Sequence, residues 1–211
     1  MPQEFLLKEY EFCFEQLRFY DKREESILKY TFSLVSAVAT ALFTVYKYFQ
    51  DQHWQIPLEG FAAVLILLFL ITLLLFFAAV SNRYYFVTTA RQVNAIRLHF
   101  LQEADRAGPP DAFGIKKNRM WKDPDWPFLQ ISSLHTYIMV GLAVISSLMA
   151  AASVYVYTIN SPSECHWTAV VPTFALALGI EIGVLFWRLP RKKQDNDGSS
   201  VPTGAGVGSP K

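Results

Sequence analysis

The chain has 211 residues, a formal net charge of +1 and 52% hydrophobic residues, with a mean hydropathy of +0.22. This apolar content is higher than that of typical soluble domains and favours a membrane protein. The small net charge excludes an overall electrostatic field that would attract a polyanion. The two cysteines, Cys13 and Cys165, lie in segments predicted below for opposite membrane faces, so we expect no disulfide between them.

Residues 1–25 are predicted to form a cytoplasmic amphipathic helix. Apolar side chains recur near one face at helical spacing, at Phe5, Leu6, Cys13, Leu17 and Tyr20. We expect this face to pack on other cytoplasmic helices. The alternative is an anchor lying on the membrane surface, which is disfavoured because anionic lipid would repel the early glutamates, Glu4, Glu9, Glu11 and Glu15.

Four apolar runs follow, and each is long enough to cross a hydrocarbon core, which needs roughly 20 helical residues. The runs are residues 26–49, 57–82, 132–157 and 167–187. Short loops join them in pairs, so we predict two transmembrane hairpins, residues 26–82 and 128–188. The predicted fold class is therefore an all-α membrane protein with four transmembrane helices and a small cytoplasmic helical part.

The distribution of basic residues predicts the orientation of these spans. Of the 19 lysines and arginines, Lys47 alone falls beside a short loop, and the others fall in residues 1–29, residues 83–127 and the segment after residue 187. Basic residues concentrate on the cytoplasmic side of membrane proteins. We therefore expect both termini and residues 83–127 to be cytoplasmic, with the chain embedded in a cell inner membrane.

The first span carries a stripe of hydroxyl groups, formed by Ser33, Ser36, Thr40 and Thr44 at helical spacing. One interpretation is close helix packing, with each hydroxyl bonded back to a backbone carbonyl. The functional interpretation is a water-facing stripe that lines a pore.

The fourth span contains a carboxylate and a ridge of small residues. Glu181 lies well inside the span, where placing an ionisable group in lipid costs free energy. Such a residue is therefore a candidate functional residue by default. Its two interpretations are a structural hydrogen bond and a pore-lining or ion-binding role. Ala175, Gly179 and Gly183 form a small-xxx-small ridge that permits close approach of another helix.

The central segment, residues 83–127, has no glycine or proline before Gly108. The second span is therefore predicted to continue as one long helix beyond the membrane. An apolar stripe on that continuation is expected to pack against the N-terminal helix, and it consists of Phe86, Ala90, Val93, Ile96 and Phe100.

A basic and aromatic segment follows this helix, with Lys116, Lys117, Arg119 and Lys122 lying close to tryptophan and phenylalanine side chains. We favour an anchor on the inner leaflet, where each positive charge contributes about 1 kcal/mol. The alternative is a site for a phosphate-bearing ligand or a nucleic acid. Residues 189–211 are rich in Gly, Ser and Pro and are expected to be disordered.

We predict that the protein is not an enzyme and needs no cofactor or metal. The sequence lacks a Walker loop, a GxGxxG motif, a nucleophile elbow and an HExxH motif, and its four histidines are scattered over different segments. Four helices are also too few to surround a wide pore. A channel built from this chain would therefore be a homo-oligomer lined by one span per subunit.

A spanning hairpin that runs into a cytoplasmic helix, with RYYFVTTARQVNAIRLHFL beginning at the membrane edge, resembles the small SLATT-like bacterial membrane effectors of anti-phage defence. The resemblance covers residues 1–107, and the second hairpin, residues 128–188, departs from it. It implies assembly into a pore that depolarises the membrane when a signal binds.

Two functions are therefore considered. The first is an oligomeric channel or pore-forming effector gated by a cytoplasmic signal, in which Arg91, Arg97 and the basic residues 116–122 sense a ligand. The alternative is a non-conducting scaffold or partner subunit that docks another membrane protein through the ridge on the fourth span. The expected partners are the lipid bilayer, further copies of the chain and a cytoplasmic ligand or protein.

Overall fold

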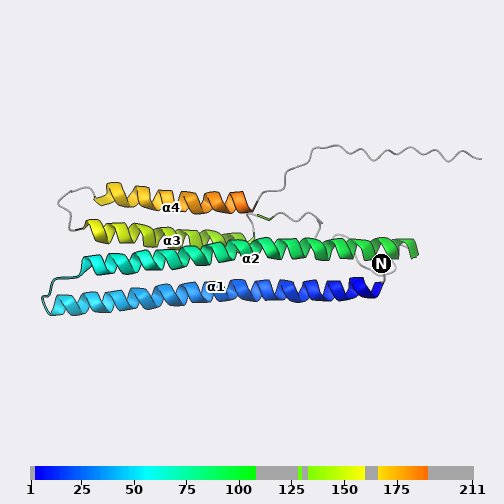
Figure 1. Ribbon diagram of the computed structural model, residues 1–211, viewed down its shortest axis with the longest axis horizontal. Helices are drawn as coiled ribbons and strands as arrows, with labels where there is room; N and C mark the ends of the chain where they lie inside the picture. Colours follow the sequence, from blue (N-terminus) through cyan, green and yellow to red (C-terminus); the bar gives the residue numbers. More distant parts are fainter. Residues whose placement is uncertain (1–2, 108–127, 130–132, 160–165, 190–211) are drawn as a thin grey trace, which may run out of the picture.

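The computed structural model describes residues 3–107, 128–129, 133–159 and 166–189. These residues form four helices, α1 (Gln3–Asp51), α2 (Leu58–Ala107), α3 (Leu134–Thr158) and α4 (His166–Arg188) (Figure 1). All the regular structure in the described part of the chain is helical, which confirms the predicted all-α class. Each helix is long and apolar enough to cross a membrane.

Helices α1 and α2 are much longer than a bilayer requires. They contain 49 and 50 residues, so each is about 75 Å long at a rise of 1.5 Å per residue, against a hydrocarbon core of about 30 Å. The structure joins the predicted N-terminal helix and the first span into one helix, because no glycine or proline interrupts residues 3–51. The predicted continuation of the second span is confirmed, since α2 extends to Ala107.

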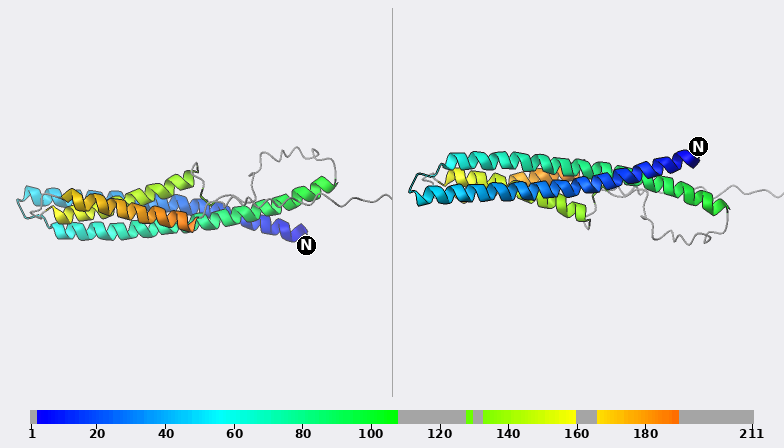
Figure 2. Two further views of the ribbon diagram at one scale, coloured as in Figure 1. Left: turned by 90° about the horizontal axis from the view of Figure 1, so that it is seen from above. Right: turned by 90° about the horizontal axis from the view of Figure 1, so that it is seen from below.

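The helices are arranged in the order α1, α2, α3, α4. Helix α2 packs against α1 on one side and α3 on the other, while α4 packs mainly against α3 (Figure 1). The C-terminal end of α3 and the N-terminal end of α4 lie at the same end as the α1–α2 turn. From the other end, α1 and α2 continue together well past α3 and α4, and Figure 2 shows the same projection from two further sides. We call the projecting parts, the N-terminal part of α1 and the C-terminal part of α2, the arm.

The turn between α1 and α2 closes the first hairpin tightly. Trp54 donates its backbone N–H to the carbonyl of Phe49 at 3.0 Å, and His53 takes a positive φ of 53°. A residue in the left-handed region commonly ends a helix in this way. The ring of Trp54 packs edge-on against Tyr48 and Phe49, with centroids 6.0 and 5.8 Å away. These contacts keep the two long helices antiparallel.

Two apolar clusters hold the helices together. The first joins the spans and includes Phe76 and Val80 of α2, Met139 and Leu142 of α3, and Leu185 of α4. Between membrane helices such side chains stabilise the structure through van der Waals packing, because lipid is as apolar as they are. The second lies within the arm, where Cys13 and Leu17 of α1 contact Phe86, Val87, Ala90 and Val93 of α2. The second cluster confirms that the predicted stripe of α2 packs on the N-terminal helix. Phe5, which we expected on the packed face of α1, is instead 53% exposed.

Helix α1 is packed far more loosely in its predicted membrane half than in the arm. The last buried residue of α1 is Thr31. After it, Val38 and Leu42 are half-buried on the side facing the rest of the chain, and Phe43 is 68% exposed. Apolar exposure of this kind carries no penalty in lipid. This half of α1 therefore presents most of its surface to lipid or to another chain.

Candidate functional site

The hydroxyl stripe lies on the outer side of α1. Ser33, Ser36, Thr40 and Thr44 are all exposed. At 100° per residue, Thr40 lies on the opposite side of the helix from Thr31, which is fully buried. Two hydroxyls bond to their own helix, because Thr40 Oγ1 donates to the carbonyl of Ser36 and Thr44 Oγ1 to that of Thr40, each at 2.8 Å. The stripe can therefore face lipid without leaving these groups unpaired, and it remains available to water or to another chain.

Glu181 lies in a different place, enclosed between α4 and α3. Its side chain is 2% exposed, and Ser146 and Ser147 of α3, which lie against it, are completely buried. Ser147 Oγ donates to Glu181 Oε2 at 3.3 Å. A single chain therefore does not bring Glu181 together with the exposed hydroxyl stripe of α1, although the sequence suggested that both line a pore.

The small-residue ridge of α4 is open in the single chain. Ala175, Gly179 and Gly183 are exposed. A Cβ atom added at Gly179 or Gly183 would have no atom within 4 Å, apart from its chain neighbours and the backbone of its own helix. The close helix packing predicted for this ridge is therefore not made within the described part of the chain, and docking through it stays a prediction.

The two arginines proposed to sense a ligand make contacts within the arm and its base. Arg91 lies over the ring of Phe128 at 4.2 Å. Arg97 on α2 donates from Nε and Nη2 to the hydroxyl of Tyr10 on α1, at 3.0 and 2.9 Å, and lies over the ring of Phe14 at 5.3 Å. Both therefore help to join elements of the chain to one another. Lys116, Lys117, Arg119 and Lys122 lie outside the described residues, as does most of the predicted disordered tail, residues 190–211.

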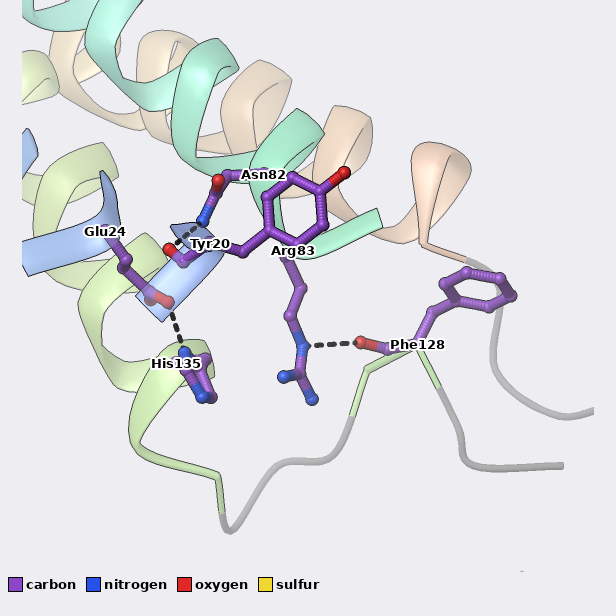
Figure 3. Close-up of polar contacts among 6 residues, drawn as sticks. All are labelled: Tyr20, Glu24, Asn82, Arg83, Phe128 and His135. Carbon is purple, nitrogen blue, oxygen red and sulfur yellow. Dashed lines mark hydrogen bonds and ion pairs between the residues drawn. The ribbon is translucent and has the colours of Figure 1, made fainter. Parts of the chain in front are cut away.

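A group of polar contacts between the helices at the base of the arm was not predicted. We call it the polar junction, and it consists of Tyr20, Glu24, Asn82, Arg83, Phe128 and His135 (Figure 3). Asn82 Nδ2 of α2 donates to the carbonyl of Tyr20 on α1 at 2.9 Å, and Arg83 Nε donates to the carbonyl of Phe128 at 3.3 Å. His135 Nδ1 of α3 contacts Glu24 Oε2 of α1. The junction thus ties three helices together where the second span ends.

Charge is concentrated in this junction. Arg83 is 2% exposed and Glu24 is 7% exposed. The Arg83 guanidinium lies 5.4 Å from the ring centroid of Phe86, while its Nη1 and Nη2 are buried and bond to no other described residue. Removing such a charge from water costs several kcal/mol unless neighbouring groups offset it. Burial lowers the pKa of Arg83, and attraction to the carboxylates of Glu24 and Asp21 offsets part of this effect.

The junction also affects the acid next to it. The Asp21 side chain is largely exposed, but partial burial beside the junction raises its pKa above the ordinary value, and the nearby Glu24 carboxylate adds to this rise. Attraction to His135 and Arg83 offsets part of the shift. Asp21 therefore carries its charge at a cost to folding.

One sequence signal for the junction existed. Asn82 and Arg83 lie at the end of the second apolar run, where polar side chains at a membrane edge can turn inward. Their partners, however, lie 62 positions away for the Asn82 bond and 45 for the Arg83 bond. No local pattern indicates such pairings.

Comparison with protein-family models, with curated proteins and with solved structures finds no match for this chain. The class is therefore defined by the fold, whose four long apolar helices are those of a multi-pass membrane protein. Among the described residues, no group of three or more His, Cys, Asp or Glu side chains is placed to hold a metal ion.

Proposed function

We propose that this chain is the subunit of a homo-oligomeric channel or pore-forming effector, gated by a signal that acts on the arm. The observation that carries the proposal is the exposed hydroxyl stripe on the side of α1 that faces away from α2. Copies arranged around an axis with α1 innermost would direct these stripes toward one another. Their hydroxyls could then exchange backbone bonds for water.

The loose packing of α1 supports assembly of several chains. In the apolar 18-residue stretch of α1 that could cross a membrane, only 11% of the residues are buried within the chain. Ala37 and Ala41, also exposed, follow Ser33 at intervals of four and make a row of small residues. Rows of this kind let membrane helices approach closely. The face that carries the stripe can therefore accept a neighbouring α1.

The continuity of α1 supports gating through the arm. One helix without a break carries both the arm contacts and the hydroxyl stripe, so a displacement of the arm is transmitted to the stripe. The arm is itself well tied, through the Arg97–Tyr10 bonds and a 2.7 Å bond from Gln92 Nε2 to Glu9 Oε1. In this proposal the arm and both termini are cytoplasmic. The role in bacterial anti-phage defence implied by the resemblance belongs to the same proposal.

The particle mass of the purified protein in lipid nanodiscs, measured without crosslinker, tests the assembly. We expect a closed ring of several copies. Liposome ion flux then tests the lining with Thr40→Leu, since an apolar constriction expels water and should remove most of the flux. Ala39→Leu is the matched control, because Ala39 is also exposed but lies about 100° around the helix from Thr40. Normal assembly with undiminished flux in Thr40→Leu contradicts the proposed lining.

A second candidate function is supported by the open ridge of α4. Exposed Gly179 and Gly183 would let a helix of another membrane protein pack closely there, making this chain a non-conducting scaffold or partner subunit. The nanodisc measurement separates the two functions. A stable monomer excludes the channel, because one layer of four helices encloses no conduction path, and favours the scaffold.

A further inference from the structure

The pair of helices α3 and α4 encloses a polar site within the predicted membrane region. Glu181 of α4 is 2% exposed, and Ser146 and Ser147 of α3 are not exposed at all. The two serines lie near the midpoint of the 25-residue helix α3. The carboxyl group is therefore shielded by protein on the α3 side and lies far from either end of that helix.

Two polar atoms of this site lack a hydrogen-bond partner within the described part of the chain. Ser147 Oγ donates to Glu181 Oε2 at 3.3 Å. The second carboxyl oxygen, Oε1, and the hydroxyl of Ser146 are both buried and have no hydrogen-bond partner among the described residues. Ser146 nevertheless lies beside the same carboxyl group. Two adjacent oxygen atoms, Glu181 Oε1 and Ser146 Oγ, thus remain without a partner in the described chain.

The surrounding helices supply no charge to balance a carboxylate. Helix α3 contains no Asp, Glu, Lys or Arg, and α2 contains none between Glu59 and Arg83. In α4 the nearest charge is Arg188, two turns away or about 10 Å along the axis. The imidazole of His135, at the start of α3, contacts Glu24 instead. An ionised Glu181 would therefore be an uncompensated buried charge.

We propose that Glu181, Ser146 and Ser147 form an intramembrane proton-binding site. A proton taken from water binds Glu181 Oε1, which then donates a hydrogen bond to Ser146 Oγ, while Oε2 is the carbonyl oxygen that accepts from Ser147. The proton neutralises a carboxylate that has no compensating charge nearby, and the resulting hydroxyl group can pair with Ser146 Oγ. Hard divalent cations take about six or more oxygen ligands, whereas these three side chains offer two carboxyl and two hydroxyl oxygens.

The site links proton occupancy to the packing of α3 against α4. Loss of the proton would leave a buried negative charge, so deprotonation requires water to enter between the two helices. This link does not depend on conduction through the stripe of α1. It holds equally if the chain is a scaffold, and a failure of either proposal leaves the other standing.

Infrared difference spectroscopy of the protein in lipid tests this proposal, because a protonated carboxyl has a C=O stretching band that a carboxylate lacks. At neutral pH in sodium-free buffer we expect this band in the wild type and its loss in Glu181→Gln. The matched control is Glu59→Gln, which removes an exposed glutamate from the first turn of α2 and should leave the band unchanged. Ser147→Ala removes the hydrogen bond to the carbonyl oxygen and should shift the band to higher frequency.

Three outcomes would overturn the assignment. One is the absence of a carboxylic acid band in the wild type at neutral pH. Another is a band that stays in place in Ser147→Ala, which also covers the case in which Glu181→Gln fails to fold. Disappearance of the band on adding sodium would identify a metal cation as the occupant. A band that is lost in Glu181→Gln, shifts in Ser147→Ala and is insensitive to sodium supports the resident proton.

Discussion

Two adjacent glutamates of α1 allow the polar junction to be tested with a matched pair of substitutions. Glu24 faces inward, is 7% exposed and contacts His135 of α3. Glu25 faces solvent and forms a salt bridge within the same helix, to Lys29 at 2.7 Å, with both side chains more than half exposed. Substituting each by alanine removes the same atoms and leaves a strong helix former in both cases. The two variants therefore differ only in what the carboxylate contacts.

The expected cost of Glu24→Ala follows from its surroundings. Removing a buried carboxylate that accepts a hydrogen bond costs about 1.5–3 kcal/mol, because its donor is left without a partner. The buried guanidinium of Arg83 also loses an attracting carboxylate. The His135 side chain is 26% exposed, and water can partly replace the lost contact. We therefore expect a loss of about 2–3 kcal/mol in the free energy of unfolding. Glu25→Ala should leave that free energy unchanged within error, since exposed pairs contribute little.

Equilibrium unfolding in detergent micelles measures both variants, with circular dichroism reporting helix content and tryptophan fluorescence reporting packing. Glu24→Ala should shift the midpoint clearly to lower denaturant, and Glu25→Ala should overlay the wild type. Equal midpoints for the two variants would refute the reasoning, because the interhelical contact would then contribute nothing beyond an exposed charge.

Two further predictions concern the arm and the edge of the junction. Burial raises the pKa of the Cys13 thiol, and the neighbouring Glu9 carboxylate adds to the rise, so Cys13 should react with maleimide far more slowly in the folded protein than after unfolding in SDS. The Cys165→Ser variant isolates this thiol for mass spectrometry, and equal rates in both states would contradict the buried contact. The pKa of Asp21 is raised in the folded protein, chiefly by partial burial. The contribution of the Asp21 carboxyl group to folding stability is therefore fully present below its ordinary pKa, and it is lost as pH rises through the raised value. The stability of Asp21→Asn relative to the wild type should therefore increase as the pH rises from acid to neutral. The increase should be small because the side chain is largely exposed. A difference that stays constant across that range would count against the shift.

The helices themselves follow from local sequence, and this part of the fold was predicted well. An apolar run of about 20 residues determines that a segment is a long helix, because backbone groups in lipid must bond within their own segment. The unbroken continuation of α2 as far as Ala107 follows from the absence of glycine and proline before Gly108. The stripe of Phe86, Ala90 and Val93 marked the face that packs in the arm. The same local signals should have joined residues 3–25 to the first span.

Side-chain partners were decided by the tertiary structure alone. The contact of Glu24 with His135 spans 111 positions, and that of Ser147 with Glu181 spans 34. Each depends on how the helices are rotated and tilted against one another, which local periodicity leaves undetermined. The same is true of the hydroxyl stripe. Its spacing was visible in the sequence, but only the packing of α1 on α2 turned Thr40 outward, away from the rest of the chain and away from Glu181. The sequence determined which segments are helices and which faces are polar, and the packing determined which of those faces meet.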